Sequence, residues 1–506
     1  MSRFIAGAVF SNNMVLQREK NISVFGYGEN TKTVIVSLNG ERAEATIGNG
    51  RWCATLPPML AGDGYTMSIE CDNEVISFTN IAIGEVWLAG GQSNMEFELQ
   101  NCKGGAEALN NDINPNVRFY YTQKNSFIDE NFFDRERRSC WSVFSEENAR
   151  NWSATGYFFA RKLAKELGVT VGIIGCNWGG TSASAWMSRE RLFADSDLKT
   201  YIDEYEKAVG GKSKEEQIKE YNDFLDYHNA WEVKAEALYT KAPDLSWDEI
   251  QEICGENKWP GPMGCSNPYR PHGLYESMLE RVIPYTLKGF IYYQGESDDH
   301  KPRMYFKLFS NLIQQWRDDW GDDSLPFLFV QLPMHTYSGS PDNKHWCLIR
   351  EAQMRVFATV KNTGIAIIPD YSEYNEIHPK DKLPVGERLA LQALYSVYKK
   401  IDESKAFGPM YKSMRILDHG IELSFDYAQD GLVSSGELKG FEIAGDNKVF
   451  FNATAQIRGD KIFAFSNEVK KPKHIRYCWS NYVEVSVFGK NAIPLAPFRT
   501  SMNDEM

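Results

Sequence analysis

The sequence predicts an α/β protein in which helices cover both faces of a central parallel sheet and β-rich segments flank this core. Two observations lead to this class. From residue 81 to about 403, short apolar runs alternate with helical patterns, as in successive βα units of a parallel sheet. On either side of that stretch, alternating runs are separated by turn dipeptides, which is typical of antiparallel strands.

The two flanking segments carry hairpin signals. Runs such as KTVIVSL and YTMSIE alternate apolar and polar residues, and Asn-Gly or Asp-Gly pairs between such runs favour tight turns. We therefore expect an N-terminal β domain over residues 1–80 and a C-terminal β domain over 404–506, both sandwich-like. The turn dipeptides are Asn39-Gly40, Asn49-Gly50, Asp63-Gly64, Asp430-Gly431, Gly445-Asp446 and Gly459-Asp460.

The core segment, residues 81–403, is expected to form one α/β domain. Apolar residues recur at helical spacing between its strand-like runs, and VGERLALQALYSVYKK predicts a closing helix. The stretch at about 196–260 breaks the alternation, because it is highly charged and helix-prone, and we expect a helical insertion that could act as a lid. The five predicted strands lie in GEVWLAG, VTVGIIGC, KGFIYYQG, PFLFVQLP and TGIAIIPD.

Length and charge limit the classes of function. A chain of 506 residues exceeds what one hydrophobic core usually serves, so two or three domains are expected. The 68 acidic residues outnumber the 55 basic ones and give a formal net charge of −13. This charge disfavours nucleic acid as a partner and is compatible with a small molecule or an oligosaccharide.

Cysteines and apolar runs bear on cofactors and location. The nine cysteines are scattered without a Cys-x-x-Cys pair, and no clustered set of ligands indicates a metal. The N-terminal run MSRFIAGAVFSNNMVLQ lacks a signal-peptide pattern, and no apolar run is long enough to span a membrane. We expect a cytoplasmic protein with reduced thiols and no membrane partner, or a secreted or periplasmic one if a signal peptide has been removed.

Polar residues gather directly after four of the predicted strands. In open parallel sheets, ligands bind beyond the carboxyl ends of the strands, so these positions bear on chemistry. They offer a serine, a glycine pair, a side-chain amide and a histidine, the groups that acyl transfer requires. The four segments are GGQSNM (90–95), NWGGTSASAW (177–186), QGESDD (294–299) and DYSEYNEIHP (370–379).

Ser93 is the candidate nucleophile and His378 the candidate base. Glu376, or more distantly Asp370 or Glu373, could orient the imidazole of His378. Taken alone, Ser93 is better explained as the N-cap of the following helix, and His378 as a solvated turn residue. The joint occurrence of reactive groups at four ends of one sheet favours the functional interpretation.

Stabilisation of an oxyanion needs two or three hydrogen-bond donors. The backbone N–H groups of Ser93 and Gly180 and the side-chain amide of Gln294 are the candidates, since glycine lets the backbone approach a ligand closely. The alternative is that Gly179-Gly180 is an ordinary turn and that Gln294 and Glu296 hydrogen-bond at the end of the sheet.

Two other groups of residues in or next to these segments are weaker candidates for a functional role. Asp298-Asp299-His300 resembles a ligand cluster, but we interpret it as a polar loop. Trp178 and Trp186 flank the glycine pair and could stack on a sugar, although large aromatic residues are as often part of the core.

A chain of motifs resembles the SGNH-hydrolase superfamily, specifically the sialate O-acetylesterase-like carbohydrate esterases. The resemblance spans roughly residues 80–400, and NNMVLQR, GFEIAG and PFRT in the flanking segments are also similar to that family. The core motifs are GEVWLAGGQSNME, GYFFARKL, GIIGCNWGGTSASAW, YYQGESD, LPFLFVQLP with REAQ, and EIHPKDKLPVGERLAL.

The resemblance implies a flavodoxin-like three-layer α/β/α SGNH hydrolase core and a reaction without a cofactor. It makes Ser93 the nucleophile and His378 the base. Many members have an Asp three residues before this His, whereas here Asn375 stands there and Glu376 lies two before, so either Glu376 or another group orients the ring. The oxyanion and substrate-binding residues implied are Gly179, Gly180, Gln294, Glu296, Gln92 and Asn94.

The predicted function is therefore a serine esterase that removes O-acetyl groups from carbohydrates. The resemblance implies a sialate O-acetylesterase-like activity on O-acetylated sialic acids, and the alternative substrates are acetylated xylan or xyloglucan oligosaccharides. One alternative is an inactive carbohydrate-binding protein. Another is a glycosidase that uses paired acids such as Glu296 and Asp298.

Overall fold

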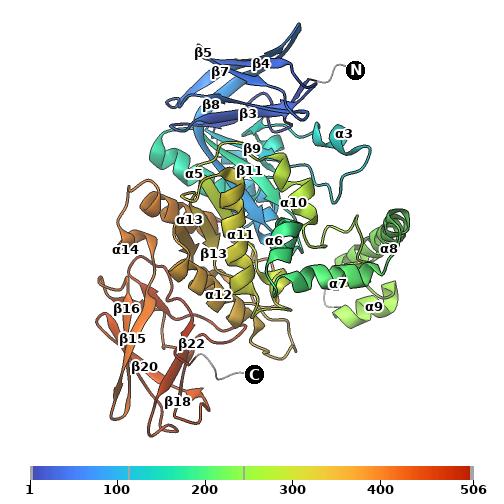
Figure 1. The fold of residues 1–506 in the computed structure, drawn as a ribbon. Helices are drawn as coiled ribbons and strands as arrows, with labels where there is room; N and C mark the ends of the chain where they lie inside the picture. The colour runs from blue at the N-terminus through green and yellow to red at the C-terminus, as the bar shows by residue number, and fades with distance from the viewer. Residues whose placement is uncertain (1–3, 112–113, 115, 243–244, 502–506) are drawn as a thin grey trace.

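The computed structural model describes residues 4–111, 114, 116–242 and 245–501. A central sheet with helices on both sides occupies the middle of the molecule, and β-rich regions lie at its two ends (Figure 1). The predicted α/β class is confirmed in this coarse form. Within the described ranges, no helix has the length and apolar character that crossing a membrane requires.

The central sheet has the strand order β10-β9-β11-β8-β12-β13-β14, and only its edge pair β9–β10 is antiparallel. All five predicted core strands are in it, whereas β9 and the two-residue edge strand β10 are additional to the prediction. The strands are β8 (Glu74–Gly91), β9 (Val117–Tyr121), β10 (Ser142–Val143), β11 (Val171–Asn177), β12 (Gly289–Tyr293), β13 (Phe327–Val330) and β14 (Thr363–Ala366).

Trp87 and Gly90 of β8 show that helices cover both faces of this sheet. They are three residues apart in a strand, so they face opposite sides. The Trp87 ring contacts Phe159 of α5 (Ala154–Leu167), with ring centroids 5.2 Å apart. On the other side, a Cβ at Gly90 would lie 2.6 Å from the ring of Trp316 in α11 (Tyr305–Trp320), so only glycine lets this helix pack so closely.

The remaining helices complete these layers and build the segment between β11 and β12. Helix α13 (Leu383–Ser396) packs on α5, and α12 (His345–Thr359) packs on α11. Helices α7 (Lys199–Val209), α8 (Lys214–Lys241) and α9 (Trp247–Cys254) project from the body of the molecule (Figure 1). The shorter helices are α1 (Ser93–Glu96), α2 (Gly105–Asn111), α3 (Phe132–Glu136), α4 (Glu146–Ala149), α6 (Arg189–Ala194), α10 (Gly273–Ser277) and α14 (Glu403–Ala406).

The N-terminal strands are continuous with the central sheet through β8. Its first half pairs with β2 and β7, and its second half pairs with β11 and β12. The predicted boundary between residues 80 and 81 falls inside this strand and stays a prediction. The other strands are β1 (Ile5–Ala6), β2 (Val15–Gln17), β3 (Ile22–Tyr27), β4 (Thr33–Leu38), β5 (Glu41–Thr46), β6 (Arg51–Leu56) and β7 (Gly62–Cys71).

The C-terminal region contains two four-stranded sheets, β15-β16-β21-β20 and β19-β18-β22-β24, and a two-stranded sheet of β17 and β23. Ile421, Leu423, Ile443 and Ile475 belong to a hydrophobic cluster separate from that of the central sheet. The strands are β15 (Met410–Leu417), β16 (Gly420–Asp426), β17 (Leu432–Ser434), β18 (Phe441–Ala444), β19 (Phe451–Asn452), β20 (Thr454–Arg458), β21 (Lys461–Phe465), β22 (His474–Tyr477), β23 (Val487–Gly489) and β24 (Phe498–Arg499).

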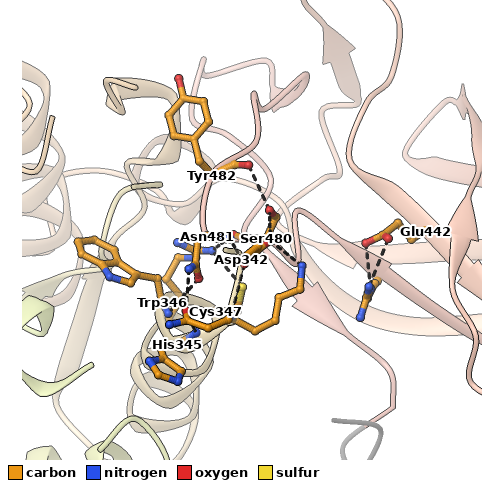
Figure 2. A network of polar contacts seen from close by, with 12 residues as sticks. Asp342, His345, Trp346, Cys347, Glu442, Ser480, Asn481 and Tyr482 are labelled. Carbon is orange, nitrogen blue, oxygen red and sulfur yellow. Dashed lines mark hydrogen bonds and ion pairs between the residues drawn. The ribbon is translucent and has the colours of Figure 1, made fainter. Parts of the chain in front are cut away.

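A polar network ties the loop between β13 and α12 to the C-terminal region (Figure 2). Asp342 of this loop accepts hydrogen bonds from the Ser480 hydroxyl at 2.6 Å and from the Asn481 backbone N–H at 3.2 Å. The Asn481 side chain accepts the Trp346 backbone N–H at 3.2 Å, and its backbone carbonyl accepts the N–H of His335 at 2.8 Å. The C-terminal region therefore fixes both ends of this loop.

Replacing Asn481 with Ala should loosen this loop. The change leaves the backbone N–H of Trp346 without its partner in a buried place, at a cost of about 1–3 kcal/mol. We expect a lower thermal midpoint and faster proteolytic cleavage between residues 334 and 344. Asn447→Ala, in an exposed turn of the same β-rich region, is the control and should change neither; equal effects of the two variants would contradict the role of Asn481.

Candidate active site

Ser93 lies where β8 gives way to α1, directly opposite His378. Its Oγ is 2.8 Å from Nε2 of His378, a hydrogen-bond distance. Gln92 occupies the N-cap position of α1 and Ser93 is the first helical residue, with no side-chain capping hydrogen bond at this end of the helix. The serine hydroxyl thus contacts the histidine rather than capping the helix.

His378 sits in the loop that follows β14, where Glu376 is its nearest acidic neighbour. One oxygen of Glu376 lies 3.9 Å from Nδ1 of His378, beyond hydrogen-bond distance. The same oxygen accepts the backbone N–H of His378 at 2.8 Å. Glu376 therefore fixes the backbone of His378 and places a negative charge beside the ring, without bonding to the ring itself.

The two alternative acids are engaged elsewhere. Asp370 accepts two hydrogen bonds from Arg388, at 2.6 and 2.7 Å. Glu373 accepts the backbone N–H of Lys380 at 2.6 Å. Among the acids predicted to orient the imidazole, the structure brings only Glu376 near it.

Burial lowers the pKa of His378, and the positive charge of Lys382 lowers it further. The carboxylates of Glu376 and Glu96 act in the opposite direction. The net direction is downward from 6.5, so the neutral imidazole, the form that can accept a proton, predominates at neutral pH.

Asn94, in α1 directly after β8, links this end of the strand to the loop that carries His378. Its amide donates to Oε1 of Glu296 at 2.6 Å and to the Ile377 carbonyl at 3.0 Å, and its oxygen accepts from the Lys382 ammonium. Burial lowers the pKa of Lys382 to about 7 and raises the pKa of Glu296. Asn94 was a predicted substrate-binding residue, but the structure commits its whole side chain to this buried network.

Glu96 organises the glycine pair, a role that the sequence interpretation missed. It accepts the Gly179 N–H at 2.8 Å, and Gly179 packs against Ser93, whose Cβ is 3.2 Å from where a Gly179 Cβ would be. Gly180 has a φ of +75°, which favours glycine. Within the described chain, the N–H groups of Ser93 and Gly180 have no hydrogen-bond partner, so both can donate to a ligand. No local sequence pattern signals this contact, since Glu96 and Gly179 are 83 residues apart.

Gln294 does not reach the pocket, which corrects its predicted role as an oxyanion donor. Its amide nitrogen donates to Asp298 at 2.6 Å and to the Thr181 carbonyl at 3.2 Å. Its oxygen accepts the Tyr305 hydroxyl at 2.9 Å. These bonds hold the side chain inside the protein, between the ends of two strands, as the alternative sheet-end interpretation expects.

Unlike Gln294, Gln92 lines the cavity. Its oxygen accepts the Ser297 backbone N–H at 3.2 Å, which turns the amide nitrogen away from that contact. No described residue accepts a hydrogen bond from this nitrogen, so it is a third donor at the site besides the backbone N–H groups of Ser93 and Gly180.

Asp298 is a structural acid in this arrangement. It accepts the Ser182 hydroxyl at 2.6 Å and the Ala183 backbone N–H at 2.9 Å, in addition to Gln294. It does not line the cavity with Glu296, so the two carboxylates do not flank a bound glycosidic bond. The residues described by the structure contain no group of three or more His, Cys, Asp or Glu side chains able to hold a metal ion.

A cavity of about 860 Å³ opens above Ser93. The strand-end loops form its floor, and helix α7 and the segment before α10 form a wall. Trp186 is buried in the core and Trp178 lies outside the lining, so neither predicted tryptophan is available to a ligand there. The lining includes Gln92, Ser93, Gly179, Gly180, Tyr201, Glu204, Tyr205, Trp259, Tyr269, Glu296, Asp299, His300, Tyr337 and His378.

The comparisons with known proteins point to carbohydrate esterases. Residues 261–394 match the family model "Carbohydrate esterase, sialic acid-specific acetylesterase". The chain is 26% identical to the sialate O-acetylesterase of Mus musculus, covering 87% of this chain and 82% of the mouse protein. It is also 26% identical to that of Homo sapiens, covering 87% of this chain and 80% of the human protein. A solved carbohydrate acetylesterase from Xanthomonas citri is 28% identical with a TM-score of 0.79, covering 98% of this chain and 99% of that one.

The shared fold over almost the whole chain and the carbohydrate esterase family match identify this protein as a carbohydrate esterase. The family match and the curated relatives narrow the class. They confirm the resemblance to the sialate O-acetylesterase-like carbohydrate esterases that the sequence motifs predict.

The lowered pKa of His378 predicts the pH dependence of the reaction. A base must be neutral to accept a proton, so with His378 in that predicted role kcat/KM for ester hydrolysis should rise with pH through a pKa below 6.5 and be level at neutral pH. The measurement is initial rate against pH with a small acetyl ester. A rising limb centred at or above 6.5 would show that the environment does not act on His378 in this way.

Proposed function

We propose that this protein is a serine esterase of the SGNH type that removes O-acetyl groups from carbohydrates through an acyl-enzyme on Ser93. The observation that carries the proposal is the 2.8 Å contact between Ser93 Oγ and His378 Nε2 in the floor of the cavity. The strands β11-β8-β12-β13-β14 stand in the order 2-1-3-4-5, which is the flavodoxin-like order and supports the three-layer core.

The first half of the proposed reaction transfers the acetyl group to the enzyme. His378 Nε2 takes the proton of Ser93 as Oγ attacks the acetyl carbonyl carbon. The oxyanion accepts hydrogen bonds from the N–H groups of Ser93 and Gly180, and Gln92 supplies a third donor in place of Gln294. The bond to the sugar oxygen then breaks, and His378 returns the proton to that oxygen.

The second half repeats these steps with water. His378 takes a proton from a water molecule, whose oxygen attacks the acetyl carbonyl of the acyl-enzyme. The bond to Ser93 Oγ breaks and the proton returns to the serine, so acetate leaves and the enzyme is restored. Glu376 stabilises the imidazolium that forms twice in this cycle, since its carboxylate lies 3.9 Å from Nδ1.

Two classes of sugar are candidate substrates for this reaction. The curated relatives are named sialate O-acetylesterases, whereas the solved structure from Xanthomonas citri is named a carbohydrate acetylesterase. O-acetylated sialic acids and acetylated plant oligosaccharides are therefore both candidates. An inactive sugar-binding protein is disfavoured, because the nucleophile and the base remain in hydrogen-bond contact.

Ser93→Ala should abolish acetate release from any acetylated sugar that the wild-type enzyme accepts. Loss of the nucleophile removes the acyl-enzyme route, so we expect a fall in kcat of about 10³-fold or more. Acetate is measured enzymatically with acetylated sialic acid and with acetylated xylo- and xyloglucan oligosaccharides. Acetate release at the wild-type rate by Ser93→Ala would refute the proposed mechanism.

Glu376→Gln tests the carboxylate beside the ring. The amide oxygen can still accept the His378 backbone N–H, but the negative charge that favours the imidazolium is lost. We expect kcat to fall by about 10–100-fold and the pH limb to move to lower pH, because loss of that charge lowers the pKa of His378 further. Glu373→Gln, in the same loop, is the control; a limb unmoved by Glu376→Gln would assign the role elsewhere.

A further inference from the structure

The charged side chains that line the cavity are acidic. Glu204, Glu296 and Asp299 contribute carboxyl groups, and the described lining contains no lysine or arginine. The ammonium of Lys301 is already bonded to Glu204 at 2.6 Å, and that of Lys382 lies below the site on Asn94. A substrate carboxylate in this cavity would therefore meet like charge without a lysine or arginine to pair with.

An aromatic wall stands beside the reacting atoms. Trp259 and Tyr269 contact each other edge to face at 5.3 Å, and the Trp259 indole N–H donates to the Tyr269 hydroxyl at 3.2 Å. Both rings come to 3.0 Å from where a Gly180 Cβ would be, which sets them against the turn that carries an oxyanion donor. Trp259 is 50% exposed, so its ring is open to a ligand. Such a surface suits the apolar face of a sugar ring.

We propose that this cavity accepts O-acetyl esters of neutral sugars and discriminates against sugars that carry a carboxylate, sialic acids included. The inference rests on the proposed esterase function and names its substrate class. Stacking on the wall needs no charge on the sugar, whereas a carboxylate would be repelled by the carboxylates of Glu204 and Asp299.

A basic hollow next to the cavity defines the competing outcome. It shares His300 with the cavity and is bordered by Lys301, Arg303 and His345. If an acidic sugar reached this hollow while its acetyl group reached Ser93, the enzyme would prefer the acid. The test must therefore compare sugars that differ in charge alone.

The first experiment uses three acetylated methyl glycosides with one ring geometry: the glucoside, the glucuronoside and the methyl ester of the glucuronoside. We expect kcat/KM for acetate release to be at least about tenfold lower for the charged glucuronoside than for its neutral methyl ester. Added salt should narrow this gap, because it screens the repulsion. O-acetylated sialic acid should behave like the charged glucuronoside.

Two failures are distinguishable in this experiment. If none of the sugars releases acetate above the level of Ser93→Ala, the proposed esterase function itself fails. If the glucuronoside or O-acetylated sialic acid reacts as fast as the neutral sugars or faster, the esterase function stands and the proposed selectivity is overturned.

Two variants on α7 locate the source of the discrimination. Glu204→Gln removes one lining carboxylate and releases Lys301, so it should raise kcat/KM for the glucuronoside relative to the methyl ester by several-fold. Asp203→Asn is the matched control, since Asp203 pairs with Lys199 and lies outside the lining, and it should leave the ratio unchanged. An unchanged ratio in Glu204→Gln would overturn the part assigned to this residue.

A second pair tests the aromatic wall. Trp259→Ala should lower kcat/KM for the acetylated glucoside about tenfold more than kcat/KM for 4-nitrophenyl acetate, which carries no sugar. Trp247, also 50% exposed but outside the lining, provides the control variant Trp247→Ala. Equal losses on both substrates in Trp259→Ala would mean that the ring supports the fold rather than the sugar.

Discussion

The site depends on a buried side chain, Asn94, that holds together segments far apart in the sequence. Its amide donates to the carbonyl of Ile377, 283 residues further along the chain, and to Glu296. Its oxygen accepts a hydrogen bond from Lys382. A buried amide with all these partners satisfied is rigid, and removing it would leave a buried carboxyl group and a buried amine unpaired. Because Ile377 precedes His378, this network also sets the direction in which the imidazole faces Ser93.

This support explains how the histidine can be placed without a carboxylate bonded to its ring. The backbone of the loop is held by Asn94 at Ile377 and by Glu376 at His378, so the position of the ring follows from main-chain contacts. Glu376 then needs to act only through its charge. The positive charge of Lys382 opposes that effect, and the pKa of His378 reflects the balance of both with burial.

The sequence predicts the parts of the molecule that follow from periodicity and strand order, and fails where side-chain direction decides. Five apolar runs predict the five core strands, and the carboxyl ends of parallel strands must meet, so Ser93, the glycine pair and His378 could be expected at one edge. Gln294 follows a strand in the same way, yet its amide turns inward to Asp298 and Tyr305. Strand position cannot distinguish that direction from one toward the cavity.

The sequence could not predict the remaining contacts. They join elements that are far apart in the chain, and no local sequence pattern specifies how such elements are placed relative to one another. Glu96 reads as a first-turn acid of α1, and only the fold shows that it binds the Gly179 N–H. Asn481 belongs to the C-terminal region, and only the fold brings it to the loop that carries Tyr337 into the cavity lining. Such contacts link segments through tertiary packing, so they become visible only with the structure.

The arrangement divides the site into two parts of different origin. The ends of the central strands hold the groups proposed to act on the ester, and hydrogen bonds tie those groups and their neighbours to one another. The wall that faces the sugar comes instead from α7 and from the segment before α10 that contains Trp259 and Tyr269. Substitutions in that wall can change the charge and shape met by the sugar without disturbing the network around Asn94. Ester chemistry and sugar selectivity can therefore change independently, so a family name taken from relatives does not by itself determine the sugar.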